Sequence, residues 1–285
     1  MLLFVDQLTN IDFSYLHSER GLVGETWLAS IEMVGELDSQ GMVCDFGVVK
    51  KTLKSWLDAT IDHCLLVPAN SPCLRRQSSS RQHQINWLGR SGEIRCDSPL
   101  SAIAFIPATD ITPESVAKWS IQQLKPQFPS SVKSLSLRFF QEAIDGPYYH
   151  YSHGLKKHLG NCQRIAHGHR SKILIWRNGE LSLQDMQGWS ERWRDIYVGN
   201  TEDLTADDDS GLYRFRYRAQ QGEFFLSLPK TCCYLMNGDS TIELIAKHIA
   251  DTLAVENPGQ HFKVKAFEGL AKGAIASSSQ ANGNV

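Results

Sequence analysis

Hydrophobic and polar positions follow the same order twice along the chain. Residues 112–142 and residues 240–268 each show the spacing of a helix, then a turn, then an alternating strand. The two strands end in Glu142 and Glu268. The apolar residues of the second helix recur on one helical face: Ile242, Ile245, Ile249 and Leu253. This repeated order favours an internal duplication.

Both helices begin with residues that are typical of helix N-termini. Thr112 followed by Pro113 fits an N-cap with a proline at the first helical position. Ser240 with Glu243 fits a capping box, in which each side chain bonds the other residue's backbone N–H. We therefore expect the two helices to begin at these residues.

The segments before these helices also correspond. Residues 13–17 parallel residues 149–153, and each segment precedes a long apolar strand. In the first copy a helix capped by Asp45 follows, whereas residues 185–197 of the second copy have a poorer helical pattern. The repeated unit is strand, strand, helix, strand, helix, strand. This order predicts an α+β fold with antiparallel sheets and helices on one sheet face.

The duplication predicts two domains, at residues 1–146 and 147–276. A disordered tail is expected at residues 277–285, which are rich in serine, glycine and asparagine. The second copy adds a predicted hairpin, with strands at residues 212–219 and 223–228. The chain is therefore expected to be two similar domains with one extra hairpin in the second.

Five arginines gather in residues 70–97 together with a run of serines. We expect this segment to form a loop. Two interpretations remain open: a solvated insertion, or a site for a phosphate-bearing ligand or RNA.

Composition narrows the classes of protein to consider. The 285 residues are 42% hydrophobic and 21% charged, and the net charge of −2 provides no general attraction for nucleic acid or an anionic membrane. Seven cysteines in no regular framework indicate free thiols in a reducing compartment. No apolar run approaches the roughly 20 residues of a membrane span, and the first residues do not resemble a signal peptide. We expect a cytoplasmic protein with neither nucleic-acid nor membrane partners.

A histidine cluster is the main chemical signal. His167 and His169 stand two residues apart, so both imidazoles point to one face if Gly168 lies in a strand. His153 on the preceding strand completes three nitrogen ligands, which leaves one coordination position open, as in catalytic zinc sites. An oxygen placed there would be polarised and made more acidic. The pattern predicts a Zn²⁺ site.

Cys162 lies between these histidines in the sequence and has three interpretations. It is a fourth ligand of a structural zinc site, a free thiol that acts as base or nucleophile near the metal, or a buried spectator. The glycine before it and Arg164 after it favour an accessible thiol.

Two further signals lie outside the cluster. In the pair Asp62–His63 the carboxylate can orient and charge the imidazole, as in a relay to a thiol, although such pairs are also common by chance. Glu142 and Glu268 end apolar strands. A carboxylate there can accept two N–H groups from the 2-amino-pyrimidinone edge of a pterin or guanine, or it is an exposed acid with no ligand.

Together these residues resemble the 6-pyruvoyltetrahydropterin synthase family, whose bacterial branch makes 6-carboxytetrahydropterin for queuosine biosynthesis. The second copy matches the zinc and cysteine part of the family pattern at Tyr149, His153, Cys162, His167 and His169. The first copy matches the Gly-Met-Val-x-Asp-Phe motif at residues 41–46 and the Asp-His pair at residues 62–63. Both copies match the Thr-x-Glu helix start and the final strand glutamate.

The matches of the two copies are complementary. The first copy keeps His17 but has Val23 and Glu25 in place of the paired histidines, so it is not expected to hold zinc. The second copy lacks the Gly-Met-Val-x-Asp-Phe motif and has residues 228–235 at the Asp-His position. In this family the active site lies between neighbouring subunits. A fused pair can therefore keep one complete site per chain.

The resemblance implies tandem tunnelling-fold (T-fold) domains in a homo-oligomer. It implies a zinc-dependent lyase that converts 7,8-dihydroneopterin triphosphate to 6-carboxytetrahydropterin. The implied residues fall into three groups: His153, His167 and His169 as zinc ligands, Cys162, His63 and Asp62 as catalytic residues, and Glu268, Glu142 and Thr241 as pterin-binding residues. The alternatives are a non-catalytic pterin- or guanine-binding protein, an enzyme that cleaves the side chain of dihydroneopterin, and a 6-pyruvoyltetrahydropterin synthase.

Overall fold

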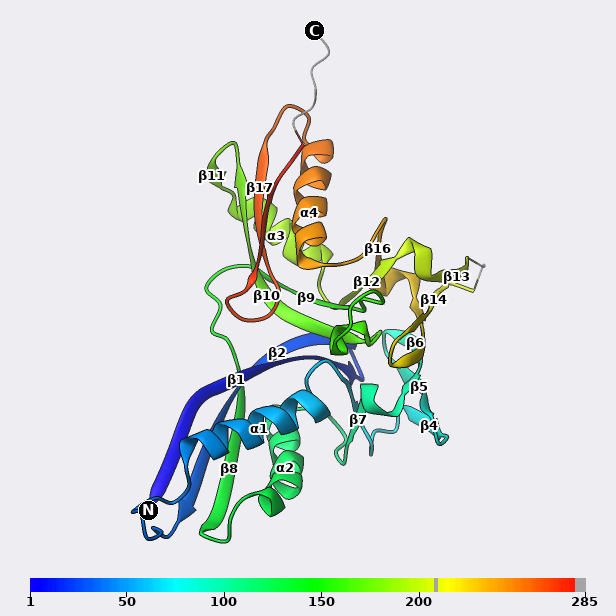
Figure 1. The fold of residues 1–285 in the computed structure, drawn as a ribbon. Helices are drawn as coiled ribbons and strands as arrows, with labels where there is room; N and C mark the ends of the chain where they lie inside the picture. Colours follow the sequence, from blue (N-terminus) through cyan, green and yellow to red (C-terminus); the bar gives the residue numbers. More distant parts are fainter. Residues whose placement is uncertain (208–209, 280–285) are drawn as a thin grey trace.

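The structure, a computed structural model, describes residues 1–207 and 210–279. It contains two α+β units and a third sheet that joins them (Figure 1). The first half of the chain runs from β1 to β8, and the second half runs from β9 to β18. None of the described helices is long and apolar enough to cross a membrane.

The first unit is a five-stranded sheet in the order β7-β3-β1-β2-β8. Its strands are β1 (Leu2–His17), β2 (Gly21–Gly35), β3 (Leu65–Pro68), β7 (Ile103–Ile106) and β8 (Val132–Gln141). Helices α1 (Phe46–Thr60) and α2 (Pro113–Leu124) cover one face and bury their apolar residues against it. The β1–β2–β8 part is antiparallel, whereas β3 pairs in parallel with both β1 and β7.

The second unit repeats this arrangement in the order β16-β12-β9-β10-β17-β18, with β11 paired to β10. Its strands are β9 (Tyr148–His153), β10 (His167–Arg177), β11 (Glu180–Leu181), β12 (Ile196–Asn200), β16 (Cys233–Met236), β17 (Phe262–Phe267) and β18 (Gly273–Ser277). Helices α3 (Leu183–Arg192) and α4 (Ile242–Glu256) pack on one face around a separate core. The predicted α+β class with helices on one sheet face is confirmed.

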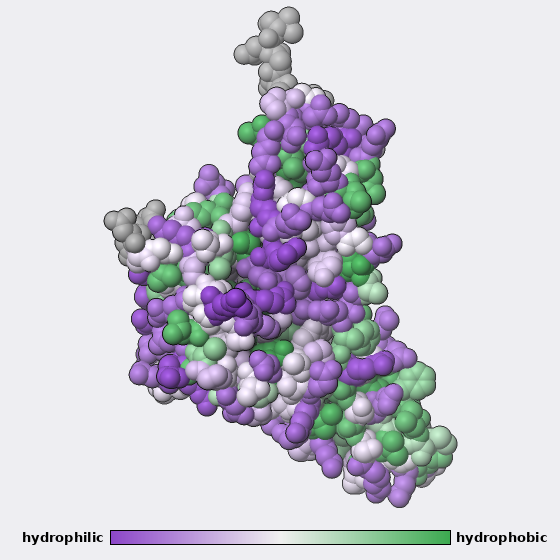
Figure 2. Space-filling model, turned by 180° about the vertical axis from the view of Figure 1, so that it is seen from behind, coloured by the Kyte–Doolittle hydropathy of each residue, from purple (hydrophilic) through white to green (hydrophobic). Residues whose placement is uncertain are grey.

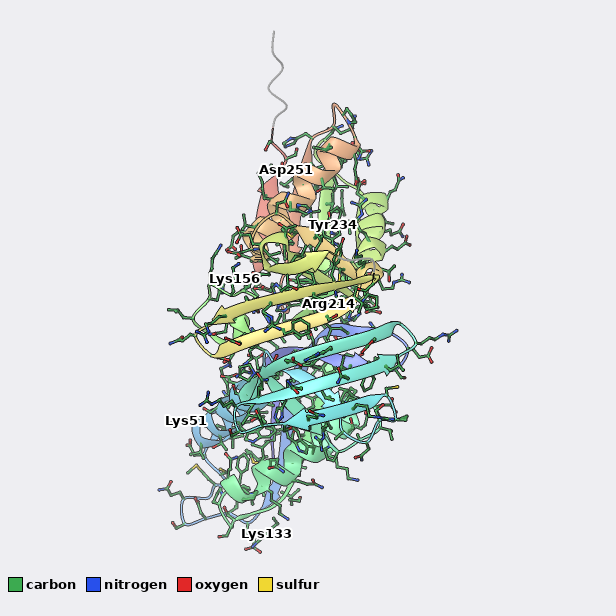
Figure 3. All side chains as sticks on the ribbon, turned by 90° about the vertical axis from the view of Figure 1, so that its right-hand side faces the viewer. Lys51, Lys133, Lys156, Arg214, Tyr234 and Asp251 are labelled. Carbon is green, nitrogen blue, oxygen red and sulfur yellow. The ribbon has the colours of Figure 1, made fainter. Side chains whose placement is uncertain are left out.

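The third sheet takes three strands from each half, in the order β13-β14-β15-β6-β5-β4 (Figure 3). Its strands are β4 (Leu74–Ser78), β5 (Gln82–Gly89), β6 (Gly92–Pro99), β13 (Leu204–Asp207), β14 (Leu212–Ala219) and β15 (Gly222–Pro229). The hairpin predicted in the second copy is β14–β15. We predicted a loop at residues 70–97, and this prediction was wrong. Ile85, Trp87 and Ile94 are buried and alternate with polar residues, as expected for the strands β5 and β6 in which they lie.

Helix starts follow the predicted caps with one exception. Asp45 accepts from the backbone of α1, and Thr112 forms a capping box with Ser115 at the start of α2. The cap of α4 is Thr241, which accepts from Leu244 N, and not Ser240. Ser240 bonds a histidine of the candidate site instead.

The C-terminal tail is ordered further than expected. Strand β18 extends to Ser277, and Ser278 is buried with its hydroxyl accepting from Phe262 N. Residues 280–285 of the expected disordered tail lie outside the described residues.

The two halves are related by a local twofold axis, because equivalent residues of the two halves touch each other. Ser14 pairs with Gly24 in the first sheet, as Ser152 pairs with Gly168 in the second, and the Ser14 and Ser152 hydroxyl oxygens are 2.7 Å apart. A Cβ at Gly168 would lie 2.7 Å from Gly24 Cα. Glycine is therefore required where the two sheets cross.

The third sheet obeys the same axis. Strand β6 begins at Gly92 and β15 begins at Gly222, so Cys96 and Leu226 occupy the same position in their strands. These two residues are directly paired across the β6–β15 junction. Through this pairing, the three strands from the first half and the three strands from the second half form one continuous third sheet.

The axis corrects the predicted alignment of the copies. Since Ser14 corresponds to Ser152, the counterpart of His153 is Tyr15, not His17. The backbone amides of residues 19 and 20 donate to His17 Nδ1, so this side chain belongs to the β1–β2 turn. The correct alignment of β1 with β9 therefore differs from the predicted one by two residues, and a shift of two residues leaves each side chain on the same strand face.

One end of the first unit carries an exposed apolar surface. Figure 2 shows apolar residues gathered at this end of the molecule, around the N-terminal part of the first half. Leu2, Phe4 and Val34 belong to it and are all exposed. Leu2 and Val34 are paired across β1 and β2, so the three side chains share one sheet face.

Candidate active site

Three buried histidines converge at the start of β10 and the end of β9. His167 is paired with His153 across the two strands, and His169 lies two residues further along the same face. One ring nitrogen from each of the three histidines lies within 4.8 Å of the corresponding atom of the other two. His153 Nε2 and His169 Nε2 are 3.2 Å apart. The structure therefore brings the three predicted ligands together.

The hydrogen-bond partners of the Nδ1 atoms determine which nitrogen of each ring carries the hydrogen. His153 Nδ1 lies 3.1 Å from the carbonyl oxygen of Ser240, and His167 Nδ1 lies 2.9 Å from that of Arg164. A carbonyl oxygen only accepts, so both Nδ1 atoms carry the hydrogen and both Nε2 atoms present lone pairs. Burial also lowers the pKa of His153 and of His167, which keeps both rings neutral.

The third ring faces a carboxylate of the first half. His169 Nδ1 lies 3.3 Å from Asp12 Oδ1, so His169 Nε2 also presents a lone pair. Two lone pairs only 3.2 Å apart repel unless a cation lies between them. Tetrahedral zinc with Zn–N distances near 2.0–2.1 Å separates its nitrogen ligands by about 3.3 Å. The donor set fits a zinc ion.

The Asp62–His63 pair lies beside this cluster. It follows α1, and Asp62 Oδ2 is 2.6 Å from His63 Nδ1. The ring centroids of His63 and His167 are 4.9 Å apart. His63 is held with a positive φ of 56°. The first half thus directs this imidazole at the histidines of the second half.

Cys162 reaches the same place from the second half. The Cys162 thiol, a His63 ring nitrogen and a His167 ring nitrogen lie within 4.8 Å of one another. Burial alone would lower the pKa of His63, but hydrogen bonds with Asp62 and Cys162 raise it to about 10. Cys162 is partly exposed in a short turn. The Asp-His pair and the cysteine therefore meet within one chain.

Asp12 is a site residue that the sequence patterns did not reveal. Besides contacting His169, it donates its N–H to Asp62 Oδ1 at 2.8 Å and accepts from His63 N at 2.6 Å. Burial opposes its ionisation, but His169 and Lys272 hold the pKa of Asp12 well below its usual range. An acid between Ile11 and Phe13 in an apolar strand was the available signal.

Arg164 was noted only as a neighbour of the cysteine. Its carbonyl orients His167, while its guanidinium donates to the Asp62 carbonyl at 3.4 Å and to Cys64 Sγ at 2.9 Å. It also donates to Gln221 Oε1 at 3.1 Å. This buried side chain ties the second half to the segment that carries the Asp-His pair.

The two predicted glutamates occupy different environments. Glu268 Oε1 lies 3.7 Å from His169 Nε2, and its side chain keeps 22% exposure. Glu142 Oε1 lies 3.6 Å from Lys172 Nζ. The strand register pairs Trp27 with Gln141, so Gln141 rather than Glu142 is the counterpart of Glu268. A shift of one residue turns Glu142 to the other strand face.

Thr241 adjoins the site through its neighbour. The hydroxyl oxygen of Thr241 accepts from Leu244 N, which leaves its hydrogen available to donate. Ser240 holds His153, as described above. The start of α4 therefore supplies both a histidine partner and a donor.

The first half lacks a second copy of this site. The counterparts of His153, His167 and His169 are Tyr15, Val23 and Glu25. The counterpart of His63 is Asp195, which shares its place before the inner strand and its positive φ, 58° against 56°. Arg194 then stands in the place of Asp62. The alignment of residues 228–235 with the Asp-His pair was therefore wrong.

Comparison with known proteins finds similarity in the first half of the chain. Residues 11–145 match the model of the 6-pyruvoyl tetrahydropterin synthase family. A solved 6-pyruvoyltetrahydropterin synthase of Plasmodium vivax is 18% identical over 51% of this chain and 93% of its own, with a TM-score of 0.42. The enzyme of Plasmodium falciparum is 15% identical over 50% of this chain and 98% of its own, with a TM-score of 0.39. No curated protein matches the chain.

The family match and the histidine cluster fall in different halves. The matched residues include Asp12 and the Asp62–His63 pair, whereas the three histidines and Cys162 follow them in the repeated unit. Residues 11–145 of the chain are thus similar to the 6-pyruvoyl tetrahydropterin synthase family.

Proposed function

We propose that the protein is a zinc-dependent lyase that converts 7,8-dihydroneopterin triphosphate to 6-carboxytetrahydropterin. The observation that carries this proposal is the meeting of Cys162 with His63 beside three histidines whose Nε2 lone pairs converge. His63 comes from the first half of the chain, whereas Cys162 and the three histidines come from the second half. The match of residues 11–145 to the 6-pyruvoyl tetrahydropterin synthase family model supports a pterin synthase-type reaction for this constellation.

The histidines form the metal part of the proposed site. His153, His167 and His169 would hold Zn²⁺, which supplies Lewis acidity toward the hydroxyl groups of the substrate side chain. Their outer contacts, hydrogen bonds to Ser240 and Arg164 and the 3.3 Å contact with Asp12, fix the direction of each lone pair. These partners would keep the three histidine rings oriented toward the metal.

Proton transfer falls to the cysteine and the Asp-His pair. The Cys162 thiolate takes a proton from the substrate side chain. His63 lies next to this sulfur as a cation, and Asp62 supports that charge through its contact of 2.6 Å. The high pKa of His63, about 10, matches this role.

Glu268 and Thr241 are the proposed pterin anchors. The Glu268 carboxylate faces the histidines and is partly exposed, so it can accept two N–H groups from a pterin edge. The Thr241 hydroxyl can donate to the same ring. Glu142 is the rival anchor, and its contact with Lys172 makes it the weaker candidate.

We also propose a homo-oligomer in the cytoplasm. The exposed apolar face formed by Leu2, Phe4 and Val34 is suited to burial against another copy. All seven cysteines are free, which suits a reducing compartment. Queuosine biosynthesis is the pathway that the proposed product would serve.

An assay with 7,8-dihydroneopterin triphosphate tests the proposed reaction. The wild-type protein is expected to release 6-carboxytetrahydropterin, acetaldehyde and triphosphate, and Cys162→Ala and His63→Ala are expected to lose this activity. Tight pterin binding without turnover by the wild type would support a binding protein instead. Retention of the side chain as a pyruvoyl group would indicate a 6-pyruvoyltetrahydropterin synthase, and turnover of dihydroneopterin alone a side-chain-cleaving enzyme.

A further inference from the structure

A cavity lies where the local twofold axis places the counterpart of the histidine site. It has a volume of about 920 Å³ and is open to solvent. His150, Asp195 and Gln141 line it. By strand register these residues are the counterparts of Asp12, His63 and Glu268. The cavity is therefore formed by the same strand positions as the candidate active site, but with different side chains.

Arginine side chains line this cavity, whereas histidines form the candidate metal site. Arg20, Arg170 and Arg194 line it, together with the carboxylates of Asp195 and Glu191. Arg20 makes two hydrogen bonds to Asp195, at 2.8 and 2.6 Å, so these charges compensate each other. Within residues 1–207 and 210–279, no ion pair is formed by Arg170, Arg194 or Glu191.

Arg170 is the residue that most requires a ligand. It is only 7% exposed, and its guanidinium lies 4.2 Å from the ring centroid of Tyr148. Its guanidinium donates to the carbonyl oxygen of Glu142 at 2.9 Å, a neutral acceptor. The buried Glu25 carboxyl acts on this cation by charge, but among the described residues no carboxylate forms an ion pair with it, and such a buried cation is costly. An oxyanion entering the cavity would remove this cost.

The remaining polar wall restricts the ligand further. His150 Nδ1 lies 2.8 Å from the carbonyl oxygen of Gly24, so His150 Nε2 is a neutral acceptor. Burial lowers the pKa of His150 to about 4, in agreement with a neutral ring. Tyr148, 40% exposed, offers an aromatic surface beside Arg170. A bare anion satisfies Arg170 but not His150.

We propose that this cavity binds a small flat molecule that carries an oxyanion, either phosphate or carboxylate, together with an N–H or O–H donor. Arg170 and Arg194 bind the oxyanion, His150 accepts from the donor, and Tyr148 supports the ring. The Arg20–Asp195 pair holds the two halves together at the wall of the cavity. This site is separate from the proposed reaction and does not depend on it.

Isothermal titration of the full chain with two probes tests the proposal. Guanosine monophosphate presents a phosphate and pterin-6-carboxylate presents a carboxylate, and both carry N–H donors. The titrations use His167→Ala protein as well as wild type, so that binding at the histidine site is recognised by its loss. Binding that persists in His167→Ala is expected for at least one probe, and the probe that binds identifies the oxyanion.

Cavity variants assign this binding to the arginines. Arg170→Met and Arg194→Ala are each expected to weaken it by about tenfold or more. Arg216→Met is the control, because Arg216 is an exposed arginine that stacks on Phe225 in the third sheet. Arg194→Ala keeps the test decisive if Arg170→Met fails to fold. Equal affinity in Arg194→Ala and wild type, or no binding of either probe to His167→Ala, would overturn the proposal.

Discussion

Asp12 Oδ1 in the first half lies 3.3 Å from His169 Nδ1 in the second half. The same residue bonds Asp62 through its backbone N–H and His63 through its carbonyl oxygen. One strand position therefore connects the histidine cluster with the Asp-His pair. A change at Asp12 should reach both parts of the site.

Asp12→Asn tests the first of these connections. The amide keeps the shape but loses the charge that orients His169, so zinc affinity is expected to fall by about 10–100-fold. Competition with a chelator measures this loss. Asp58→Asn, in an exposed pair with Lys54, is the matched control and should bind zinc as the wild type does. Equal affinity in all three proteins would show that Asp12 does not support the metal.

His63→Ala separates catalysis from metal binding. Loss of the proton-transfer partner is expected to reduce kcat by about 10²–10⁴-fold, with zinc content unchanged because the three ligands remain. Steady-state kinetics and metal analysis on the same sample check both parts. His83→Ala is the control, since His83 lies on the third sheet and bonds Ser78. Loss of zinc in His63→Ala would place His63 among the ligands.

Arg164→Met tests the tie between the halves. The variant removes a buried guanidinium that bonds Asp62, Cys64 and Gln221, so the free energy of unfolding is expected to fall by roughly 2–4 kcal/mol. Urea unfolding measures the change. Arg218→Met, at an exposed ion pair with Glu223, should stay within about 0.5 kcal/mol of wild type. Similar losses in both variants would contradict the role of Arg164.

Glu25 gives the protein a pH-dependent stability. Burial raises its pKa from 4.5 to about 7, against hydrogen bonds from Thr26 N and Gln141. Between these values the unfolded carboxyl ionises while the folded one stays protonated, so stability falls as the pH rises. The total loss is about 3 kcal/mol.

Glu25→Gln should remove this loss. Between pH 5 and pH 8 the free energy of unfolding is expected to fall by about 2.5 kcal/mol more in wild type than in Glu25→Gln. Every other titrating group contributes equally to both proteins. Parallel pH dependences would show that Glu25 ionises normally in the folded state.

Local signals explain which parts of the fold the sequence predicted. Asp45 and Thr112 cap helices because their side chains reach backbone amides within three residues. The histidines at 167 and 169 share a face because alternation in a strand is a local rule. The arginine-rich segment hid the same alternation, since Trp87 and Ile94 were separated by charged residues.

Long-range relationships explain what the sequence did not predict. The contact of Asp12 with His169 spans the two halves, and no local pattern encodes it. The sequence alignment of the two copies was wrong by two residues at His153. A shift of two residues leaves every side chain on the same strand face, so the hydrophobic pattern did not reveal the error. At Gln141 the shift was one residue, which exchanges the faces. Only pairing partners on neighbouring strands distinguish these registers.

The central claim is that one chain holds a complete site, with Cys162 of the second half beside His63 of the first half. Mixed assemblies test it directly. Cys162→Ala and His63→Ala chains are unfolded together, refolded together and assayed with 7,8-dihydroneopterin triphosphate, with refolded wild type as the reference. If the site lies within one chain, every chain in the mixture carries a defect, and the mixture will be no more active than the separate variants. Recovery of a substantial part of the wild-type activity would show that the two residues meet between chains and would contradict the claim.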